Sequence, residues 1–261
     1  MPFNVKCKLV KKEFLKDDIC KMTISAPEIA KAAKPGQFLE IRVVDNIEPL
    51  LRRPISIYNA NENNGEVEFI FQIKGNGTEL LSKRNEGELL DIMGPLGYGT
   101  FKCEDYKNIA IIGGGIGIFP LHELSKRAKD AGVNSKIYIG FRNKDLVVLE
   151  DEFNKVCDEL ILATDDGSYA KNGFAINFLK EDVKQNKPDC IYACGPLPML
   201  KAVQAFAKEE NIPCQISLEE RMACGIGVCL GCAVKYVGSD DVNYKHVCKN
   251  GPVFNANDVE I

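Results

Sequence analysis

The stretch KNIAIIGGGIGIFP, residues 107–120, decides the fold of this chain. Its segment NIAII at 108–112, with an apolar run at 109–112, has the length of a buried strand, and glycines follow the run directly. The next segment, LHELSKRAKDAG at 121–132, carries apolar residues at helical spacing and ends at a glycine. A buried strand that turns through glycines into a helix predicts the first unit of a parallel, doubly wound sheet.

The glycines themselves form a candidate phosphate site. Gly115, Gly117 and Pro120 give the pattern G-x-G-x-x-P, in place of the G-x-G-x-x-G of dinucleotide-binding folds. Proline is tolerated in a first helical turn, and a helix N-terminus favours an anion. A tight turn without a ligand is the alternative. No acidic residue at the end of a second strand marks an adenosine ribose, so the choice between NAD and NADP stays open.

Downstream, strands and helices alternate. We expect buried strands at SKIYIGF (135–141), ELILATDDGS (159–168) and DCIYACGP (189–196), and helices at 172–183 and 198–211. This order predicts a Rossmann-like parallel sheet, whose carboxyl edge is where such sheets bind ligands. Cys194 and Gly195 fall at that edge, and the glycine would let a planar ring approach. A buried thiol at a turn is the other interpretation.

Upstream, residues 1 to about 100 have the pattern of short β-strands. FLEIRVV (38–44) and EVEFIFQI (66–73) are rich in aromatic and β-branched residues and are separated by turn sequences. Strands at this spacing favour an antiparallel β-barrel or a sandwich. One short helix is expected to open at Thr78, within GNGTELLSK.

Two weaker patterns lie in this β region. In RRPISIY (52–58), Arg53 precedes a rigid proline and a hydroxyl at Ser56, and an arginine offers planar paired donors to a phosphate. A solvated arginine on an edge strand is the alternative. In GNGT, Gly77 permits close backbone approach before a helix N-terminus, although Thr78 could simply cap the helix.

Near the C-terminus, ACGIGVCLGC (223–232) holds Cys224, Cys229 and Cys232, and Cys248 follows further on. The spacing C-x4-C-x2-C with a distant fourth cysteine is the plant-type arrangement for a [2Fe–2S] cluster. Structural zinc sites usually contain two C-x2-C pairs, and only one is present here. A zinc ion and a disulfide remain the alternatives.

Overall composition limits the partners and the cellular compartment that we expect for this protein. The 261 residues carry a net charge of −4, with no long run of one sign, which argues against nucleic acid or an anionic membrane as a partner. The chain shows neither a signal peptide nor a membrane-spanning stretch, so we expect a cytoplasmic protein with reduced thiols. The remaining cysteines are expected to be small buried apolar residues, Cys194 excepted: Cys7, Cys20, Cys103, Cys157, Cys190 and Cys214.

A dinucleotide site and an iron–sulfur cluster on one chain raise a chemical requirement. Nicotinamide delivers two electrons as hydride, whereas a [2Fe–2S] cluster accepts one at a time. A flavin can do both and belongs between them. This requirement favours a flavin site built from RRPIS and GNGT in the N-terminal barrel.

The order of these motifs gives a family resemblance. RRPIS, GNGT, GPLG, GGGIGIFP and CGPLPM together resemble the ferredoxin–NADP reductase superfamily along the whole chain. EERMACGIGVCLGCAVK (219–235) and HVCKNGPVF (246–254) are similar to one family within it, the electron-transfer subunits of class 1B dihydroorotate dehydrogenases.

The resemblance implies an FAD-binding β-barrel at 1–102, a Rossmann-like NAD domain at 103–215 and a [2Fe–2S] module at 216–261. Cys224, Cys229, Cys232 and Cys248 would ligate the cluster. The FAD would be lined by Arg53, Pro54, Ile55, Ser56, Ile70, Phe71, Gln72, Gly77 and Thr78.

The resemblance also implies a partner and a reaction. The partner would be an FMN-containing dihydroorotate dehydrogenase catalytic subunit, in a heterotetramer of two plus two. Electrons would pass from that FMN through the cluster and FAD to NAD⁺ as dihydroorotate becomes orotate in pyrimidine biosynthesis. Neither histidine, His122 or His246, stands in a pattern suited to proton abstraction, so we expect no residue catalysing the substrate chemistry on this chain.

Two other functions share parts of this pattern. One is the small subunit of an NADPH:ferredoxin oxidoreductase or a related bifurcating complex. The other is a non-enzymatic binding module with a zinc ion in the cysteine segment and a nucleotide-sensing domain.

Overall fold

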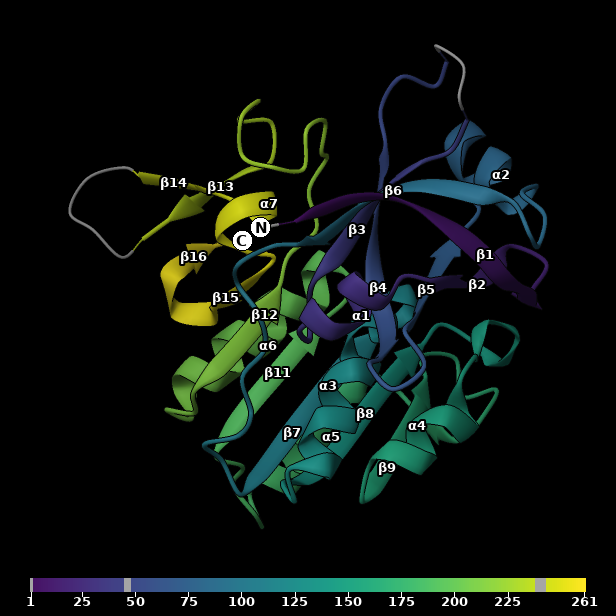
Figure 1. The fold of residues 1–261 in the computed structure, drawn as a ribbon. Coiled ribbons are helices and arrows are strands. Elements are labelled where there is room, and N and C mark those ends of the chain that lie inside the picture. Colours follow the sequence, from purple (N-terminus) through teal and green to yellow (C-terminus); the bar gives the residue numbers. More distant parts are fainter. Residues whose placement is uncertain (1, 45–47, 238–242) are drawn as a thin grey trace.

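The N-terminal third of the chain forms a closed antiparallel barrel, as predicted (Figure 1). The structure, a computed structural model, describes residues 2–44, 48–237 and 243–261. The barrel strands follow the order β1-β2-β5-β4-β3-β6. Their bounds are β1 Phe3–Lys16, β2 Ile19–Ser25, β3 Phe38–Arg42, β4 Arg53–Asn61, β5 Glu66–Gln72 and β6 Leu89–Leu96.

Alternating burial along these strands explains the barrel. In β6, every second side chain from Leu90 to Leu96 is buried, which is the period of a strand with one face on a core. Side chains such as Leu9, Met22, Ile41 and Phe69 fill the interior. Two helices accompany the strands, α1 at Pro27–Ala32, which was not predicted, and α2 at Asn76–Ser82.

The start of α2 corrects one expectation. The helix begins at Asn76 rather than at Thr78, because extended Gly75 is its N-cap and Thr78 already lies in the first turn. The Thr78 hydroxyl turns back and accepts hydrogen bonds from the backbone N–H groups of Lys74 (3.0 Å) and Gly75 (3.3 Å). Thr78 thus caps the N-terminus of α2 from a position within the first turn of the helix.

The middle of the chain forms a parallel sheet with helices on both faces, as predicted. Its order is β10-β9-β8-β7-β11-β12-β15. The parallel strands are β7 Asn108–Gly114, β8 Asn134–Phe141, β9 Glu159–Thr164, β10 Lys171–Asn172, β11 Cys190–Cys194 and β12 Cys214–Ser217. The α-helices are α3 Phe119–Asp130, α4 Glu150–Val156, α5 Ala175–Val183 and α6 Leu197–Glu209, and short 3-10 turns are η1 Gly115–Ile118, η2 Lys144–Leu146 and η3 Ala256–Asp258.

In strand β7 the side chains of the apolar run 109–112 contribute to two hydrophobic cores, one on each face of the sheet. Ile109 and Ile111 pack in the cluster that contains α3 and α4 side chains, whereas Ala110 and Ile112 pack in the cluster that contains α5 and α6 side chains. Successive side chains of a strand point to opposite faces, so an apolar run without alternation is what a doubly covered strand requires.

The C-terminal segment is tied to this sheet. Its strand β15 (Val253–Asn255) pairs antiparallel with β12 at the sheet edge. The other elements are β13 Ala233–Tyr236, β14 Asn243–His246, α7 Val247–Asn250 and β16 Val259–Glu260, with the three strands in the order β14-β13-β16. Within the described ranges, none of the helices has both the length and the apolar character to cross a bilayer.

Helix α3 joins the sheet to the barrel through strand β4, an arrangement we call the α3–β4 contact. The buried Glu123 carboxylate accepts hydrogen bonds from the Ala60 N–H (3.0 Å) and from Arg127 Nε (2.8 Å). Lys126 donates to Asn59 Oδ1 (2.8 Å), and the ring of His122 stacks on Tyr58 with 4.2 Å between centroids. The α3–β4 contact fixes the barrel relative to α3. Because β4 also carries Arg53 and Ser56, it places these two residues relative to the N-terminus of α3.

Candidate functional site

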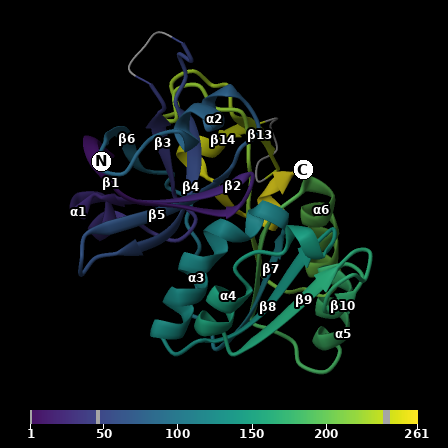
Figure 2. The same cartoon turned by 90° about the vertical axis from the view of Figure 1, so that its right-hand side faces the viewer.

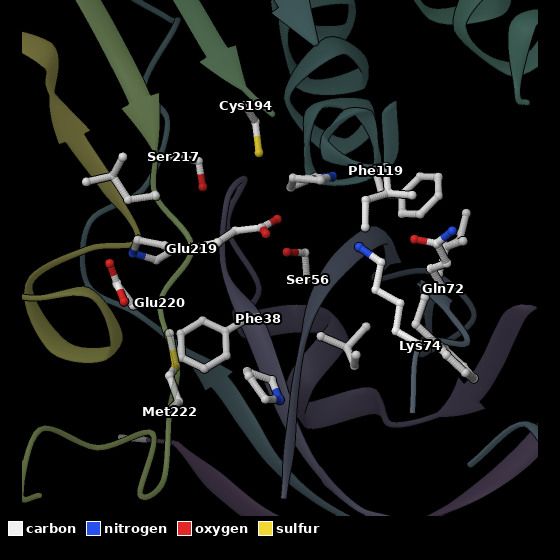
Figure 3. Close-up of a pocket in the computed structure, with 18 residues that line it drawn as sticks. Phe38, Ser56, Gln72, Lys74, Phe119, Cys194, Ser217, Glu219, Glu220 and Met222 are labelled. Atoms are coloured by element: carbon white, nitrogen blue, oxygen red, sulfur yellow. The ribbon is translucent and has the colours of Figure 1, made fainter. Parts of the chain in front are cut away.

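A cavity of about 230 Å³, here called the central cavity, lies where the barrel, the start of α3 and the chain after β12 meet (Figure 3). It brings together predicted residues from distant parts of the sequence, which are Pro54, Ile55, Ser56, Ile70, Phe71, Gln72 and Cys194. The other lining residues are Phe38, Lys74, Ile116, Phe119, Pro120, Ser217, Leu218, Glu219, Glu220, Met222 and Pro252. Apolar walls with a few polar groups are typical of cofactor sites.

Three polar side chains point into this cavity from three different segments. Figure 3 shows the hydroxyl of Ser56, the amine of Lys74 and the carboxyl of Glu219 turned toward its interior. Ser56 comes from β4, Lys74 follows β5, and Glu219 follows β12. A polar planar ring held against the apolar wall would find both donors and acceptors at its edge.

Arg53, Gly77 and Thr78 lie outside the lining of the cavity, but the first two are in contact. A Cβ at Gly77 would overlap the Arg53 guanidinium, so only glycine allows the arginine to lie against the start of α2. Arg53 also donates to the backbone oxygen of Leu51. The arginine is therefore positioned beside a helix N-terminus, an arrangement suited to an anion.

The two glycine turns of the sheet meet at its carboxyl edge. A Cβ at Gly117 would overlap the Cα of Gly195, because β7 and β11 are adjacent parallel strands with Gly113 opposite Cys194. Neither Gly115, Gly117 nor Gly195 lines the central cavity, whereas the neighbouring Ile116 and Pro120 do. Pro120 is the second residue of α3, which agrees with the expected first-turn proline.

Sequence reasoning missed Ser217 and Glu219. Ser217 lies opposite Cys194 in the pairing of β11 and β12, and burial raises the pKa of the Cys194 thiol. The accessible part of the Glu219 side chain faces the cavity. Desolvation raises the pKa of its carboxyl, although the positive charge of Lys74 acts to lower it. Ser217 ends strand β12 and Glu219 follows it at the sheet's carboxyl edge, so the rule that singled out Cys194 could have found them.

The segment 223–232, here called the cysteine loop, is arranged around the sulfur of Cys224. The backbone N–H groups of Val228 (3.3 Å), Cys229 (3.4 Å) and Ile226 (3.5 Å) donate to this sulfur. Desolvation opposes ionisation, but these donors and the Cys229 side chain together lower the pKa of Cys224 to about 6. The loop thus favours a thiolate, the form in which cysteine binds metal.

The four candidate ligands approach one another in two pairs. The side chains of Cys224 and Cys229 interact, as do those of Cys232 and Cys248, and the Cys248 N–H also donates to the Cys232 sulfur (3.4 Å). The backbone of Gly227 donates to Cys248 and so links the pairs. In the part of the chain that the structure describes, no three His, Cys, Asp or Glu side chains converge on one point, and no disulfide joins any cysteine. Two thiolates on each of two irons match this pairing better than four on one zinc ion.

One buried carboxyl lies between the barrel and the cysteine loop. Glu40 of β3 is paired in register with Pro54 on one side, and Gly225 lies so close that a Cβ there would be 2.6 Å from Glu40 Cγ. Neither carboxyl oxygen has a hydrogen-bond partner within the described residues. Desolvation raises the pKa of Glu40 to about 7, although the positive charge of Arg52 acts to lower it.

The cysteines outside the loop behave differently. Cys7, Cys20, Cys103, Cys190 and Cys214 are buried as expected, but Cys157 is only half-buried, because it follows the last turn of α4. Burial raises the pKa of the Cys7, Cys20 and Cys103 thiols to about 11. Unlike Cys224, these thiols remain protonated at neutral pH.

Comparison with known proteins covers both ends of the chain. Residues 219–260 match the family model described as the iron–sulfur cluster binding domain of dihydroorotate dehydrogenase B. Residues 6–101 match the oxidoreductase FAD-binding domain. A Bacillus velezensis protein named dihydroorotate dehydrogenase B (NAD(+)), electron transfer subunit, is 40% identical over 247 residues, which are 94% of each chain. The chain belongs to this family of electron transfer subunits.

A second curated relative carries the same name, and two solved structures share the fold. A Fusobacterium nucleatum protein of the same name is 41% identical over 248 residues, covering 94% of this chain and 93% of that protein. A solved NADH-dependent reduced ferredoxin–NADP oxidoreductase structure has a TM-score of 0.86 at 30% identity, covering 100% of this chain and 91% of the other. The ferredoxin reductase of carbazole 1,9a-dioxygenase, at 20% identity and a TM-score of 0.67, shares the fold over 81% of this chain and 67% of its own.

Proposed function

We propose that this chain carries electrons from the FMN of a dihydroorotate dehydrogenase catalytic subunit to NAD⁺, using a bound [2Fe–2S] cluster and FAD. Family membership supports the reaction, in which dihydroorotate becomes orotate in pyrimidine biosynthesis. The observation that carries the proposal is the central cavity, which lies between the barrel wall and the carboxyl edge of the sheet, with the cysteine loop, whose backbone donors favour a thiolate at Cys224, beside the barrel. We further propose a cytoplasmic heterotetramer of two subunits of each kind.

In this proposal the barrel holds the flavin. Pro54, Ile55 and Ser56, with the strand segment Ile70–Gln72, form the wall for the ring system, and Ser56 offers a hydroxyl at its edge. Arg53, placed against Gly77 at the start of α2, would neutralise the pyrophosphate, with Thr78 holding the helix N-terminus in shape. Bound FAD would supply the exchange between two-electron and one-electron steps.

The sheet edge is the proposed nicotinamide side. Gly115 and Gly117 would let a phosphate approach the N-terminus of α3, and Gly195 would let the nicotinamide ring approach beside Cys194. Glu219 and Ser217 line the same side of the cavity and are candidates for orienting the ring. Substrate chemistry belongs to the partner, so none of these residues is assigned a role in dihydroorotate oxidation.

The cysteine loop is the proposed cluster site. Cys224 and Cys229 would hold one iron, and Cys232 and Cys248 the other, in keeping with the two pairs of side chains. We propose that the FAD barrel, NAD domain and cluster module divide at residues 102–103 and 215–216. Strand β15 would then be contributed to the NAD-domain sheet by the cluster module.

A reconstitution experiment tests the function. The chain loaded with FAD and iron–sulfur cluster is mixed with the FMN-containing subunit, and NAD⁺ reduction is followed with dihydroorotate as donor. We expect NADH formation by the complex and none by either subunit alone. A complex that ignores dihydroorotate and reduces ferredoxin would instead place the chain with the reduced ferredoxin–NADP oxidoreductases.

A further inference from the structure

Glu40 is a buried carboxyl to which the chain supplies no partner. The residue is 1% exposed, and neither of its carboxyl oxygens has a hydrogen-bond partner in the described part of the chain. The guanidinium of the nearby Arg52 binds the Asp91 carboxylate (2.7 Å) and backbone oxygens instead. A buried polar group without a partner costs stability, so the reason for a glutamate at this position must lie outside the packing of the chain.

The place of this carboxyl in the fold is the barrel wall between the central cavity and the cysteine loop. The two sequence neighbours of Glu40 pack in the barrel core, so Glu40 and Phe38 share the opposite face of β3. Phe38 lines the central cavity, and Pro54, the partner of Glu40 in the pairing of β3 with β4, lines it as well. On its other side the Glu40 side chain meets the cysteine loop at Gly225. The carboxyl therefore lies between the proposed flavin wall and the proposed cluster site.

The cysteine loop passes directly against this carboxyl. A Cβ on Gly225 would lie 2.6 Å from Cγ and 2.8 Å from Oε1 of Glu40, so a glycine at 225 is what lets the loop pass so closely. The preceding residue is Cys224, whose sulfur receives the backbone N–H donors of the loop and whose charge acts on the Glu40 carboxyl. Figures 1 and 2 both show the yellow-green cysteine loop at the barrel end of the molecule, away from strands β7, β8 and β9.

We propose that Glu40 is a positioning residue of the cluster, whose neutral carboxyl donates a hydrogen bond to the Cys224 sulfur and so raises the reduction potential of the cluster. The inference rests on the proposed function, in which Cys224 is a cluster ligand. An ionised carboxylate would be buried here without a donor, next to a thiolate, which is far more costly than the neutral acid. The acid holds one O–H donor, and hydrogen bonds to the sulfurs are one means by which a protein sets the potential of an iron–sulfur centre.

A redox titration of the cluster tests this role. The chain loaded with FAD and cluster is titrated with a reductant in the presence of redox mediators, and the electron paramagnetic resonance of the reduced cluster is recorded for the wild type, Glu40→Leu and Glu40→Gln. Glu40→Leu removes the donor, so we expect the equilibrium constant for cluster reduction to fall about tenfold, which for one electron is a midpoint about 59 mV lower. Glu40→Gln keeps a neutral donor at the same place, so its midpoint should stay at the wild-type value.

Two further measurements separate an effect on the potential from an effect on the structure. Glu13→Leu makes the same change at an exposed carboxyl, which pairs with Lys11 in strand β1, and should leave the midpoint unchanged. Glu40→Leu should unfold at a denaturant concentration no lower than that of the wild type, because an apolar side chain replaces a buried polar group without a partner. Iron and FAD contents should equal those of the wild type in all three variants.

The possible failures are distinguishable. An unchanged midpoint in Glu40→Leu with full iron content would overturn the role of Glu40 and leave the proposed function standing. A higher midpoint in both Glu40 variants would also overturn it, because it would reveal a native carboxylate whose charge opposes reduction. Should Glu40→Leu not take up its cluster, Glu40→Gln decides, since a midpoint away from the wild-type value would contradict the neutral donor. If the wild-type chain itself takes up no cluster, the proposed function is wrong and this inference falls with it.

Discussion

The central cavity and the cysteine loop are organised in opposite ways. The cavity lies between packed units, and the buried α3–β4 contact holds its two sides in register. The cysteine loop has few packed side chains, and three backbone N–H groups directed at one sulfur give it shape. The difference indicates that packing within the chain is sufficient to form the cavity, whereas the cysteine loop reaches its final conformation only with the cluster that we propose it binds. Four predictions test this contrast, from the largest expected effect to the smallest.

The largest effect is expected for Cys232→Ser. Loss of one thiolate should remove the visible cluster spectrum and all electron transfer to the catalytic subunit, because even residues behind a metal ligand are worth about 10- to 100-fold. FAD content and NADH oxidation with an artificial acceptor should be retained, since the cavity does not depend on the loop. Cys157→Ser, at a half-buried cysteine, should leave all three readouts intact. Loss of FAD together with the cluster would show that the two regions are not independent.

Acid should lower the free energy of unfolding through His122, which lies in the α3–β4 contact. Desolvation lowers the pKa of this buried imidazole to about 4, with Lys21 and Lys126 acting in the same sense and Glu68 opposing them. The unfolded chain takes up the proton near pH 6.5 and the folded chain near pH 4, so stability is full above pH 6.5 and falls as the pH drops toward 4. The loss reaches at most about 3 kcal/mol. Chemical unfolding of His122→Phe, which keeps an aromatic ring on Tyr58, should lack this decline, and an unchanged pH profile would contradict the assignment.

A smaller effect is expected for FAD affinity. Arg53→Lys keeps the charge but loses the planar paired donors, so FAD should bind about tenfold more weakly. Arg52→Lys is the matched control, because the Arg52 guanidinium is engaged by Asp91 (2.7 Å) of strand β6. Titration of the apoprotein with FAD measures both. Equal losses in the two variants would mean that the placement of Arg53 on Gly77 gives this arginine no special part in FAD binding, and would contradict the assignment.

The smallest effects concern stability. Val228→Ser should change the free energy of unfolding by less than about 0.5 kcal/mol, because its side chain is exposed. Ile112→Val, in the sheet core, should cost about 1 kcal/mol. Denaturant unfolding compares the two variants, and a larger loss at Val228 would show that the loop is packed more tightly than its exposure indicates.

Most of the fold could be predicted because it follows from local patterns. The apolar run before Gly113 and the helical spacing after Pro120 were sufficient for the parallel sheet, and β-branched strands were sufficient for the barrel. The predicted start of α2 was wrong because threonine is a common N-cap residue, whereas the N-cap position is occupied by Gly75, which has no side chain to mark it.

The candidate site was less accessible to prediction. Pro54 and Ser56 were expected at the site because their motif is local, and Gln72 was expected only from the family resemblance. Glu219 and Lys74 enter the cavity only through the way the units pack. Glu40 gave no signal, since a glutamate in a strand pattern predicts a solvated face, and its burial depends on the cysteine loop that covers it.

The most direct test of the central claim follows electrons through both regions of one molecule. The loaded wild-type chain and Cys232→Ser are titrated with NADH under argon, with flavin absorbance and the electron paramagnetic resonance of the cluster recorded together. We expect the wild type to show flavin bleaching and a reduced-cluster signal, and Cys232→Ser to show bleaching alone. A wild-type chain with full FAD and iron content that bleaches but never shows a cluster signal would contradict the account.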